Sequence, residues 1–477
     1  MCAASACKTG ESLSADSAGT LVWPLPQQLS AHGGVLRLHQ DFALVDHAGA
    51  DGVAATARLP ATLQRFSELL ERMGVRDVGR QEFHEGTGSV GGSPGATLRA
   101  LRIRMGNSSG ADDAPTIDTD YSYSLRVRAA DALLQAQSVF GVMYGLETFV
   151  QLLKRGARGD LVLPHSTIDI NDAPQYKWRG VMVDAGRRFF PVHLLHNLLE
   201  TMGAVKMNVL HLHASDYCRW SVQSKLYPEL TVTDITGTSP GSYTQDEIKA
   251  LVAYAADRGI RVVPEFDLPG HSRSLVPLAK HGLEFCGNAS DLTHANQIKR
   301  GTHGRSLEVL KSLLGEMAGL FPDAVFNIGA DETLVEAGCP ANDTRLLEAE
   351  LLGAVQSMGK TAMGWEQLLS LSATPPSGAN SSRPQHLFDR NATIINAYSG
   401  TTAAAVAALG HYAVESHAPA FYFTHPAGWD QHWKQGKCAY GCHGPVGWEM
   451  CWYDVAVGAT AELLPKILGA FSNPTTA

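Results

Sequence analysis

Three absences exclude several classes of protein for this chain. Its 477 residues contain no apolar run of about 18 residues, which argues against a membrane span. Asp and Glu outnumber Lys and Arg by 47 to 38, and the net charge of -9 leaves no basic surface for nucleic acid or anionic lipid. Residues 1–20 lack the basic start and the apolar segment of a secretory signal. We therefore expect no membrane span and no nucleic-acid partner, and a neutral substrate fits the charge best.

Cysteine is scarce and widely spaced. The eight cysteines form no CxxC pair, so the sequence predicts no structural zinc site.

Hydrophobic residues at 44% and charged residues at 18% are the balance of a soluble globular protein. Asn-x-Ser/Thr sequons indicate glycosylation, and a gene product that lacks its signal would reconcile them with the N-terminus. These sequons lie at Asn107, Asn288, Asn342, Asn380 and Asn391.

The length predicts more than one domain. We interpret residues 1–20 as unstructured and residues 21–170 as an α+β domain with a structural role. The domain has two segments that alternate as strands do and two with helical spacing. The strands are Val35–Val45 and Tyr121–Val127, the helices Ala61–Met73 and Ser138–Leu153, and Glu85–Gly95 is expected to be a loop.

Residues 174–477 repeat strand and helix in turn, which is typical of a (β/α)8 TIM barrel of the α/β class. The predicted strands are 179–184, 208–213, 260–267, 324–329, 361–365, 393–398, 412–415 and 444–450. Pro191 is expected at the first position of the first barrel helix, and Thr244 with Glu247 forms a capping box for the second. Few residues follow the last apolar segment, 461–468, so the closing helix is expected to be incomplete.

The stretch Ala324–Thr333 is the centre of the functional argument. A short apolar run reads as a buried strand, and it ends on the adjacent carboxylates Asp331 and Glu332. Neighbouring residues of a strand point to opposite sides, so the two carboxylates can have different proton affinities, as acid catalysis with a partner requires. The alternative is that Asp331 and Glu332 only cap the next helix.

Other polar and aromatic residues are expected at the same carboxyl ends of the barrel strands, where barrels carry active sites. They are Asp184, Arg187, Arg188, His211, His213, Asp216, Asp267, His271, Asp331, Glu332, Trp365, Glu366, Tyr422, Trp448, Glu449, Trp452 and Asp454. Aromatic rings beside carboxylates suit a sugar, which has apolar faces and hydroxylated edges.

Six motifs follow one another along the chain. They begin at Val22 (VWPLPQ), Gly141 (GVMYGLETFVQLL), Arg179 (RGVMVDAGR), Lys206 (KMNVLHLHASD), Pro264 (PEFDLPGH) and Phe326 (FNIGADE). With these motifs, the sequence resembles the glycoside hydrolase family 20 β-N-acetylhexosaminidases over residues 21–468. The resemblance implies an exo-acting enzyme that removes terminal non-reducing β-linked N-acetylglucosamine or N-acetylgalactosamine from glycans, with no cofactor.

The resemblance also implies roles for catalytic residues. Glu332 would be the general acid, and Asp331 would hold the acetamido group, whose oxygen is the nucleophile in a substrate-assisted retaining mechanism. Asp216 and His271 match residues that hydrogen-bond in a chain to the acid. We further expect the charge of Asp331 to raise the pKa of Glu332.

Substrate-binding roles follow in the same way. Arg187 would grip ring hydroxyls, Trp365 and Trp452 would line the pocket, Tyr422 would bind the acetamido oxygen, and Asp454 would accept from a hydroxyl. Without the resemblance, the arginine could be a surface ion pair, the histidine at 271 a turn residue, and the tryptophans core residues.

The resemblance also implies a disulfide between Cys286 and Cys339, with free buried thiols as the alternative. It favours a lysosomal or secreted protein and is compatible with a homodimer. Some positions depart from the family pattern: Tyr217, Asn327, Ala330, Tyr398, Thr424 and Asp454.

Two other functions compete with this one. His211, His213, His271 and Asp331 could be the ligands of a metal-dependent amidohydrolase, which also uses a barrel. A degenerate family member that binds glycans without cleaving them is the other alternative, motivated by Ala330, Thr424 and the short C-terminus.

Overall fold

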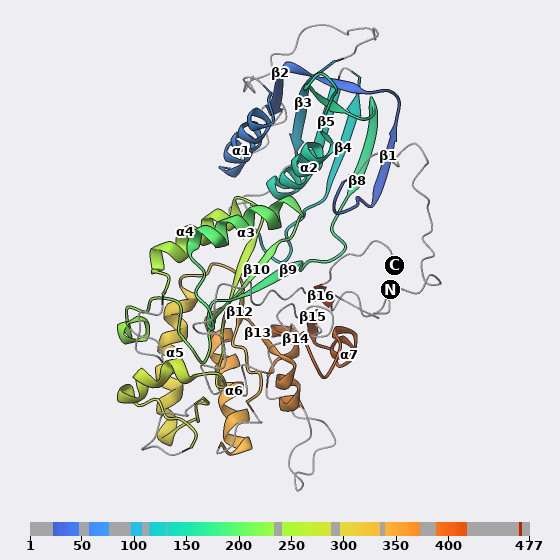
Figure 1. Cartoon of the computed structure of the whole chain (residues 1–477). Coiled ribbons are helices and arrows are strands. Elements are labelled where there is room, and N and C mark those ends of the chain that lie inside the picture. The colour runs from blue at the N-terminus through green and yellow to red at the C-terminus, as the bar shows by residue number, and fades with distance from the viewer. Residues whose placement is uncertain are drawn as a thin grey trace, which may run out of the picture.

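The computed structural model shows two β-sheets, each with its own helices (Figure 1). The structure describes residues 22–46, 57–75, 97–106, 114–129, 131–232, 241–287, 296–333, 339–372, 388–416 and 467–469. The first sheet is formed by strands up to Asp172 and the second by strands from Gly180 onward. None of the helices in these ranges is long and apolar enough to cross a membrane.

The first sheet is mixed, with eight strands in the order β1-β8-β4-β5-β3-β2-β7-β6. Parallel ladders join β2 to β3 and β3 to β5, and the other ladders are antiparallel. The strands are β1 (Gln28–His32), β2 (Leu36–Asp46), β3 (Thr97–Met105), β4 (Tyr123–Arg128), β5 (Asp131–Ala136), β6 (Lys154–Arg155), β7 (Leu161–Leu163) and β8 (Thr167–Asp172).

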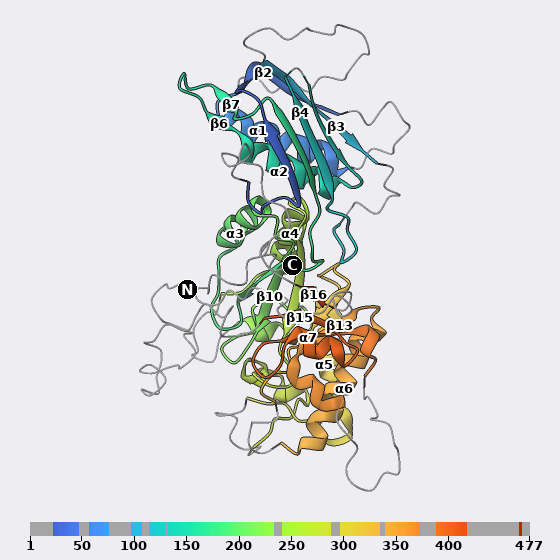
Figure 2. The ribbon, with the colours of Figure 1, turned by 90° about the vertical axis from the view of Figure 1, so that its right-hand side faces the viewer.

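Helices α1 (Arg58–Arg72) and α2 (Val139–Leu152) lie against the same face of this sheet (Figure 2). The side chain of Ser138 caps α2 by accepting from the backbone N–H of Gly141, 3.0 Å away. The buried faces of both helices form one apolar cluster with the strands, as their spacing predicted. The expected loop at Glu85–Gly95 lies outside the described residues.

The second sheet is parallel and places its eight strands side by side in chain order, from β9 to β16. Its strands are β9 (Gly180–Asp184), β10 (Val209–Ser215), β11 (Arg261–Phe266), β12 (Val325–Asn327), β13 (Thr361–Trp365), β14 (Thr393–Ala397), β15 (Tyr412–Glu415) and β16 (Ile467–Gly469). This curled sheet, preceded by a separate mixed sheet, confirms the predicted fold class.

Helices connect successive strands of the second sheet (Figure 1). The α-helices are α3 (Val192–Ala204), α4 (Gln245–Ala256), α5 (Arg305–Ala318), α6 (Ala341–Ser357) and α7 (Ala403–Ala408). Short 3-10 helices are η2 (Pro228–Thr231), η3 (Arg273–His281), η5 (Thr302–Gly304), η6 (Glu366–Ser372) and η7 (Arg390–Ala392).

Some local predictions for this part of the chain are confirmed and others are wrong. Both hydrogen bonds of the capping box between Thr244 and Glu247 form at the start of α4. Pro191 is the N-cap of α3 and not its first residue. The strand expected at 444–450 lies outside the described residues, and the eighth place in the sheet belongs to Ile467–Gly469, where no strand was predicted. Three residues are too few to show alternation.

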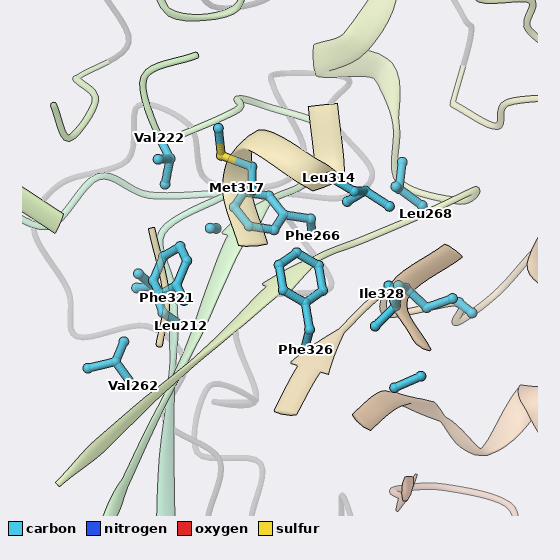
Figure 3. Packing of buried hydrophobic residues seen from close by; sticks show 14 of the residues in the cluster. Leu212, Val222, Val262, Phe266, Leu268, Leu314, Met317, Phe321, Phe326 and Ile328 are labelled. Atoms are coloured by element: carbon cyan, nitrogen blue, oxygen red, sulfur yellow. The ribbon is translucent and has the colours of Figure 1, made fainter. Parts of the chain in front are cut away.

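Successive side chains of a parallel strand point to opposite faces of the second sheet, and the two faces contact different apolar clusters. In β10, Leu210 and Leu212 belong to the large apolar cluster shared with the surrounding helices, whereas Val209 belongs to a smaller cluster on the other face. Figure 3 shows the large cluster, with Phe266 and Phe326 stacked at a ring separation of 5.7 Å. Side chains two apart share a face, so His211 and His213 lie on the face of Val209.

The first sheet and the residues around it, here called the first unit, pack on the amino ends of the strands of the second, parallel sheet. Tyr121 donates to the carbonyl of Gly259, just before β11, at 2.9 Å. The Lys206 ammonium, just before β10, donates to the hydroxyl of Tyr123 at 2.8 Å and to Asp172 at 3.0 Å. Because these contacts precede the strands, the first unit lies at the end opposite the strands' carboxyl ends.

Candidate active site

The carboxyl ends of the parallel strands bring five of the predicted site residues together. Arg187 follows β9, Asp216 follows β10, His271 follows β11, and Asp331 and Glu332 follow β12. Parallel strands all end at one edge of the sheet, so residues far apart in the chain meet there.

A continuous chain of polar contacts runs through these residues. The guanidinium of Arg187 binds Asp184 at 2.7 Å and Asp216 at 2.8 Å. The other oxygen of Asp216 lies 3.6 Å from Nδ1 of His271. The remaining ring nitrogen of His271, Nε2, lies 3.3 Å from Oε2 of Glu332 and 3.7 Å from Oδ2 of Asp331. Arg187 is thus a half-buried cation that bridges two buried carboxylates and not a surface ion pair.

Backbone geometry separates the two adjacent carboxylates. Gly329, Ala330 and Glu332 all have positive φ angles, of 70°, 66° and 54°. This left-handed turn is held by the N–H of Ala330, which donates to Oδ1 of Asp267 at 3.1 Å. As a result the side chain of Glu332 is 58% exposed and that of Asp331 only 19%. The next described helix, α6, has Pro340 as its N-cap residue, so Asp331 and Glu332 do not cap α6.

Charge inside the site is concentrated on His271 and Asp216. Burial alone would lower the pKa of His271, but the carboxylates of Asp216 and Asp331 outweigh it and hold the pKa well above its usual value. Burial would raise the pKa of Asp216, yet Arg187 and His271 hold it well below its usual value. At neutral pH the site therefore contains an imidazolium between ionised carboxylates.

The prediction for the pKa of Glu332 is wrong in direction. The hydrogen bond with His271 lowers the pKa of Glu332, and this effect exceeds the opposing effect of burial. Near the acid pair, Asp267 does have a raised pKa, because it is buried and lies next to Asp331. The sequence identified the two adjacent carboxylates, but in the fold the carboxyl group with the raised pKa is Asp267, which follows the neighbouring strand β11.

Trp365 ends β13 and is buried, but it is more than a core residue. Its indole N–H donates to Oε1 of Glu265 at 2.8 Å, and its backbone N–H donates to the carbonyl of Gly329 at 2.7 Å. Its ring meets that of Tyr398 edge-on at a separation of 5.1 Å. Glu366 accepts from the backbone N–H groups of Tyr398 and Ser399 and so holds the neighbouring loop. The indole is therefore fixed at both its ring and its backbone.

Sequence reasoning missed Glu265 and assigned no catalytic role to His213, which it listed among the residues at the strand ends. His213 lies 3.0 Å from Asp216 through Nε2 and 3.2 Å from Glu265 through Nδ1. The sequence suggested His213 as a strand-end residue and a possible metal ligand, and it gave Glu265 no role. A buried strand that carries a polar residue at every second position was the available signal, because a buried charge needs a partner.

The histidines do not form the metal site that the amidohydrolase alternative requires. Nε2 of His211 lies 2.6 Å from Glu265 and 3.1 Å from the amide of Asn327. The acid and histidine clusters found in the described part of the chain leave out His211. The predicted set of four ligands is therefore not brought together.

Three predicted binding residues, Tyr422, Trp452 and Asp454, lie outside the described residues. The disulfide between Cys286 and Cys339 is present, with 5.2 Å between the two Cα atoms. The alternative of two free thiols is therefore wrong.

The fold and the site together define a barrel-type α/β domain that carries an acid pair at its strand ends. Residues 176–449 match the glycosyl hydrolase family 20 catalytic domain, and residues 22–152 match a domain described as beta-acetyl hexosaminidase like. The first match covers more than half of the chain, so the chain belongs to glycosyl hydrolase family 20.

Individual relatives agree with this assignment. The beta-hexosaminidase subunit beta of Mus musculus is 28% identical over 366 residues, which are 73% of this chain and 66% of the relative. The beta-hexosaminidase subunit A1 of Dictyostelium discoideum is 34% identical over 239 residues, 49% of this chain and 42% of the relative. The chain thus spans less than two thirds of these relatives.

Solved structures support the fold. The chitobiase of Flavobacterium johnsoniae superposes with a TM-score of 0.68 at 24% identity, over 94% of this chain and 64% of that chain. The exo beta-N-acetylglucosaminidase of Vibrio harveyi, solved in complex with N-acetylglucosamine, has a TM-score of 0.62 at 23% identity, over 83% of this chain and 60% of that chain.

Proposed function

We propose that this protein is an exo-acting β-N-acetylhexosaminidase that hydrolyses terminal non-reducing β-linked N-acetylglucosamine or N-acetylgalactosamine. The observation that carries the proposal is the pairing of an exposed Glu332 with the buried couple His271–Asp216, beside a second carboxylate, Asp331, on the same turn. Family membership and the names of the relatives support it.

In this proposal Glu332 protonates the leaving glycosidic oxygen. It is the most exposed carboxylate of the cluster, so an incoming glycan can reach it. His271 is the adjacent proton reservoir, because its raised pKa keeps it charged at neutral pH and its Nε2 lies 3.3 Å from Glu332. Asp216, held by Arg187, keeps the imidazolium in place.

Asp331 is the proposed partner of the substrate's acetamido group. In the part of the chain that the structure describes, Oδ1 of Asp331 is buried without a hydrogen-bond donor. An acetamido N–H would satisfy it, and the carboxylate would stabilise the positive charge that develops when the acetamido oxygen attacks the anomeric carbon. Such substrate assistance gives net retention without an enzyme nucleophile.

The remaining proposed roles concern substrate binding. Arg187 would contact ring hydroxyls through its exposed edge, and Trp365 would form a wall of the acetamido pocket. The assignments of Tyr422, Trp452 and Asp454 rest on the family resemblance.

The cellular setting is proposed as well. The disulfide between Cys286 and Cys339 and the sequons favour an oxidising compartment, lysosomal or secreted, and a glycosylated protein. Pairing of subunits as a homodimer is a further proposal that rests on the resemblance.

Hydrolysis of an aryl N-acetyl-β-glucosaminide between about pH 4 and 7 tests the proposed function. Release should collapse in Glu332→Gln by about 10²-fold or more. The matching aryl β-glucoside, which lacks the acetamido group, should be left intact. A folded wild-type protein that releases nothing would contradict the enzymatic function and support a glycan-binding one.

A further inference from the structure

Glu265 is a completely buried carboxylate that the proposed mechanism does not use. It lies on β11, where the sheet register places it directly beside His213 of β10 and Asn327 of β12. A charge at such a position is costly unless every oxygen has a partner. The identity of its partners therefore indicates why a carboxylate is there.

Both oxygens of Glu265 lie close to side chains from other strands of the sheet. Oε1 accepts the indole N–H of Trp365 at 2.8 Å and lies 3.2 Å from Nδ1 of His213. Oε2 lies 2.6 Å from Nε2 of His211. One carboxylate thus joins β10, β11 and β13 at the level of the site.

Two series of side-chain contacts connect Glu265 with the proposed catalytic residues. The first passes through His213, whose Nε2 lies 3.0 Å from Asp216. Both ring nitrogens of His213 lie within ion-pair distance of carboxylates, an arrangement that favours the doubly protonated imidazolium. Glu265 and Asp184 raise the pKa of His213 well above its usual value, although burial opposes this.

The second series passes through Trp365. Its indole is fixed by Glu265, and its backbone N–H holds the carbonyl of Gly329 at 2.7 Å. Gly329 begins the left-handed turn that presents Asp331 and Glu332. The residue proposed as a wall of the acetamido pocket and the turn that carries the acid pair therefore share one support.

We infer that Glu265 is a positioning residue that fixes Trp365 and His213 at once, and thereby restricts the pocket to small N-acyl groups while it keeps Asp216 and His271 aligned. The inference rests on the proposed function for its specificity part. A rigid indole excludes an acyl chain longer than acetyl, whereas an indole without its acceptor can rotate and admit it.

The test compares Glu265→Gln with the wild type in two measurements. The first is the NMR resonance of the Trp365 indole N–H, assigned by its disappearance in Trp365→Phe, which needs no substrate. The amide oxygen of glutamine can accept the indole N–H only as a neutral acceptor, which makes a weaker hydrogen bond, so this resonance should move toward its position without a hydrogen bond. The second is kcat/KM for aryl glucosaminides that carry N-acetyl or N-butanoyl groups. In the variant, we expect kcat/KM for the N-acetyl substrate to fall about 10- to 100-fold. The ratio of kcat/KM for the N-acetyl substrate to that for the N-butanoyl substrate should decrease about 10-fold.

Asp323→Asn is the matched control. Asp323 pairs with Arg261 at 2.7 Å, at the opposite end of the same strand, β11, so its loss weakens the strand without touching the site. It should leave the indole resonance and the N-acyl preference unchanged. Glu265→Asp, which keeps the charge but is too short to span both partners, should behave as Glu265→Gln does and replaces it if the amide variant does not fold.

An unmoved indole resonance in a folded Glu265 variant would overturn the inference. So would an N-acyl preference equal to that of the wild type, or rates that fall in proportion for both substrates. If the wild type hydrolyses neither substrate while the indole resonance moves, the proposed function fails and the positioning by Glu265 stands.

Discussion

Nε2 of His271 lies 3.3 Å from Oε2 of Glu332, and this contact sets the protonation of the site. It lowers the pKa of Glu332 and, with Asp216 and Asp331, raises that of His271. The proton shared by His271 and Glu332 therefore resides on His271 until a glycosidic oxygen enters the site. A donor with a lowered pKa acts best in acid, where a larger fraction is protonated.

Replacing His271 by Asn should move the basic limb of the pH profile. Without the imidazolium, the pKa of Glu332 rises, so Glu332 stays protonated to higher pH and the basic limb of kcat/KM shifts upward. The maximal rate should fall about 10²-fold, because the aligned proton donor loses its partner. The measurement is kcat/KM for an aryl N-acetyl-β-glucosaminide between about pH 3 and 8.

His281→Asn serves as the control for this profile. His281 pairs with Glu229 at 2.7 Å, and its side chain is 39% exposed. Its profile should match that of the wild type. A basic limb in His271→Asn that stays in place or moves to lower pH would show that His271 does not control the acid.

Gly329→Ala should disrupt the turn beneath the acid pair. Gly329 has a φ of 70°, and a Cβ there would clash with the side chain and Cα of Asp267. Left-handed strain and overpacking together should cost about 2–5 kcal/mol, and activity should fall at least about 10²-fold. Thermal unfolding and hydrolysis rates measure the two effects.

Ala330→Gly is the opposite change at the next residue. Ala330 already has a φ of 66°, so replacing it by glycine relieves about 1–2 kcal/mol of backbone strain. Glycine also gives the unfolded chain more conformational entropy, which lowers the free energy of unfolding by about 0.4–1 kcal/mol. Stability should be unchanged or rise by up to about 1.6 kcal/mol. A clear loss of stability in this variant would refute the strain argument for the turn.

Glu348 should make the protein less stable as the pH rises from about 4.5 to about 7. Burial raises the pKa of Glu348 to about 7, against the hydrogen bond from Thr333 and the charge of Arg345. Below pH 4.5 both states are protonated. Above it the unfolded chain loses its proton first, so up to about 3 kcal/mol of stability is lost by pH 7.

Unfolding by urea across this pH range should show a shallower decline in Glu348→Gln than in the wild type. Glutamine keeps an oxygen that can accept the hydroxyl of Thr333, but it does not titrate. Identical pH dependence in the two proteins would mean that Glu348 is not the group responsible.

Replacing both Cys286 and Cys339 by Ser should lower the stability of the oxidised protein by about 2–4 kcal/mol. The disulfide closes a sequence separation of 53, which restricts the unfolded chain. The midpoint of urea denaturation reports the change. Unchanged stability would show that the bridge adds nothing beyond the surrounding packing.

Elements with a strong local signal were predictable from the sequence. Thr361–Trp365 and Tyr412–Glu415 form strands with the bounds expected, and α4 begins at its capping box. Apolar runs between helices and a hydroxyl followed by Glu three residues later are local patterns. The three-residue β16 has no such pattern and forms only because β15 offers it a ladder.

The sequence by itself determined the alternation of strand and helix, the candidate acid pair Asp331–Glu332, and the residues that surround it. Tertiary structure decided the direction of the pKa of Glu332, the bridging of Asp184 and Asp216 by Arg187, and the place of Glu265 among His211, His213 and Trp365. The physical reason is that proton affinity depends on distance and burial. Strand register sets both by joining residues that are far apart in the chain.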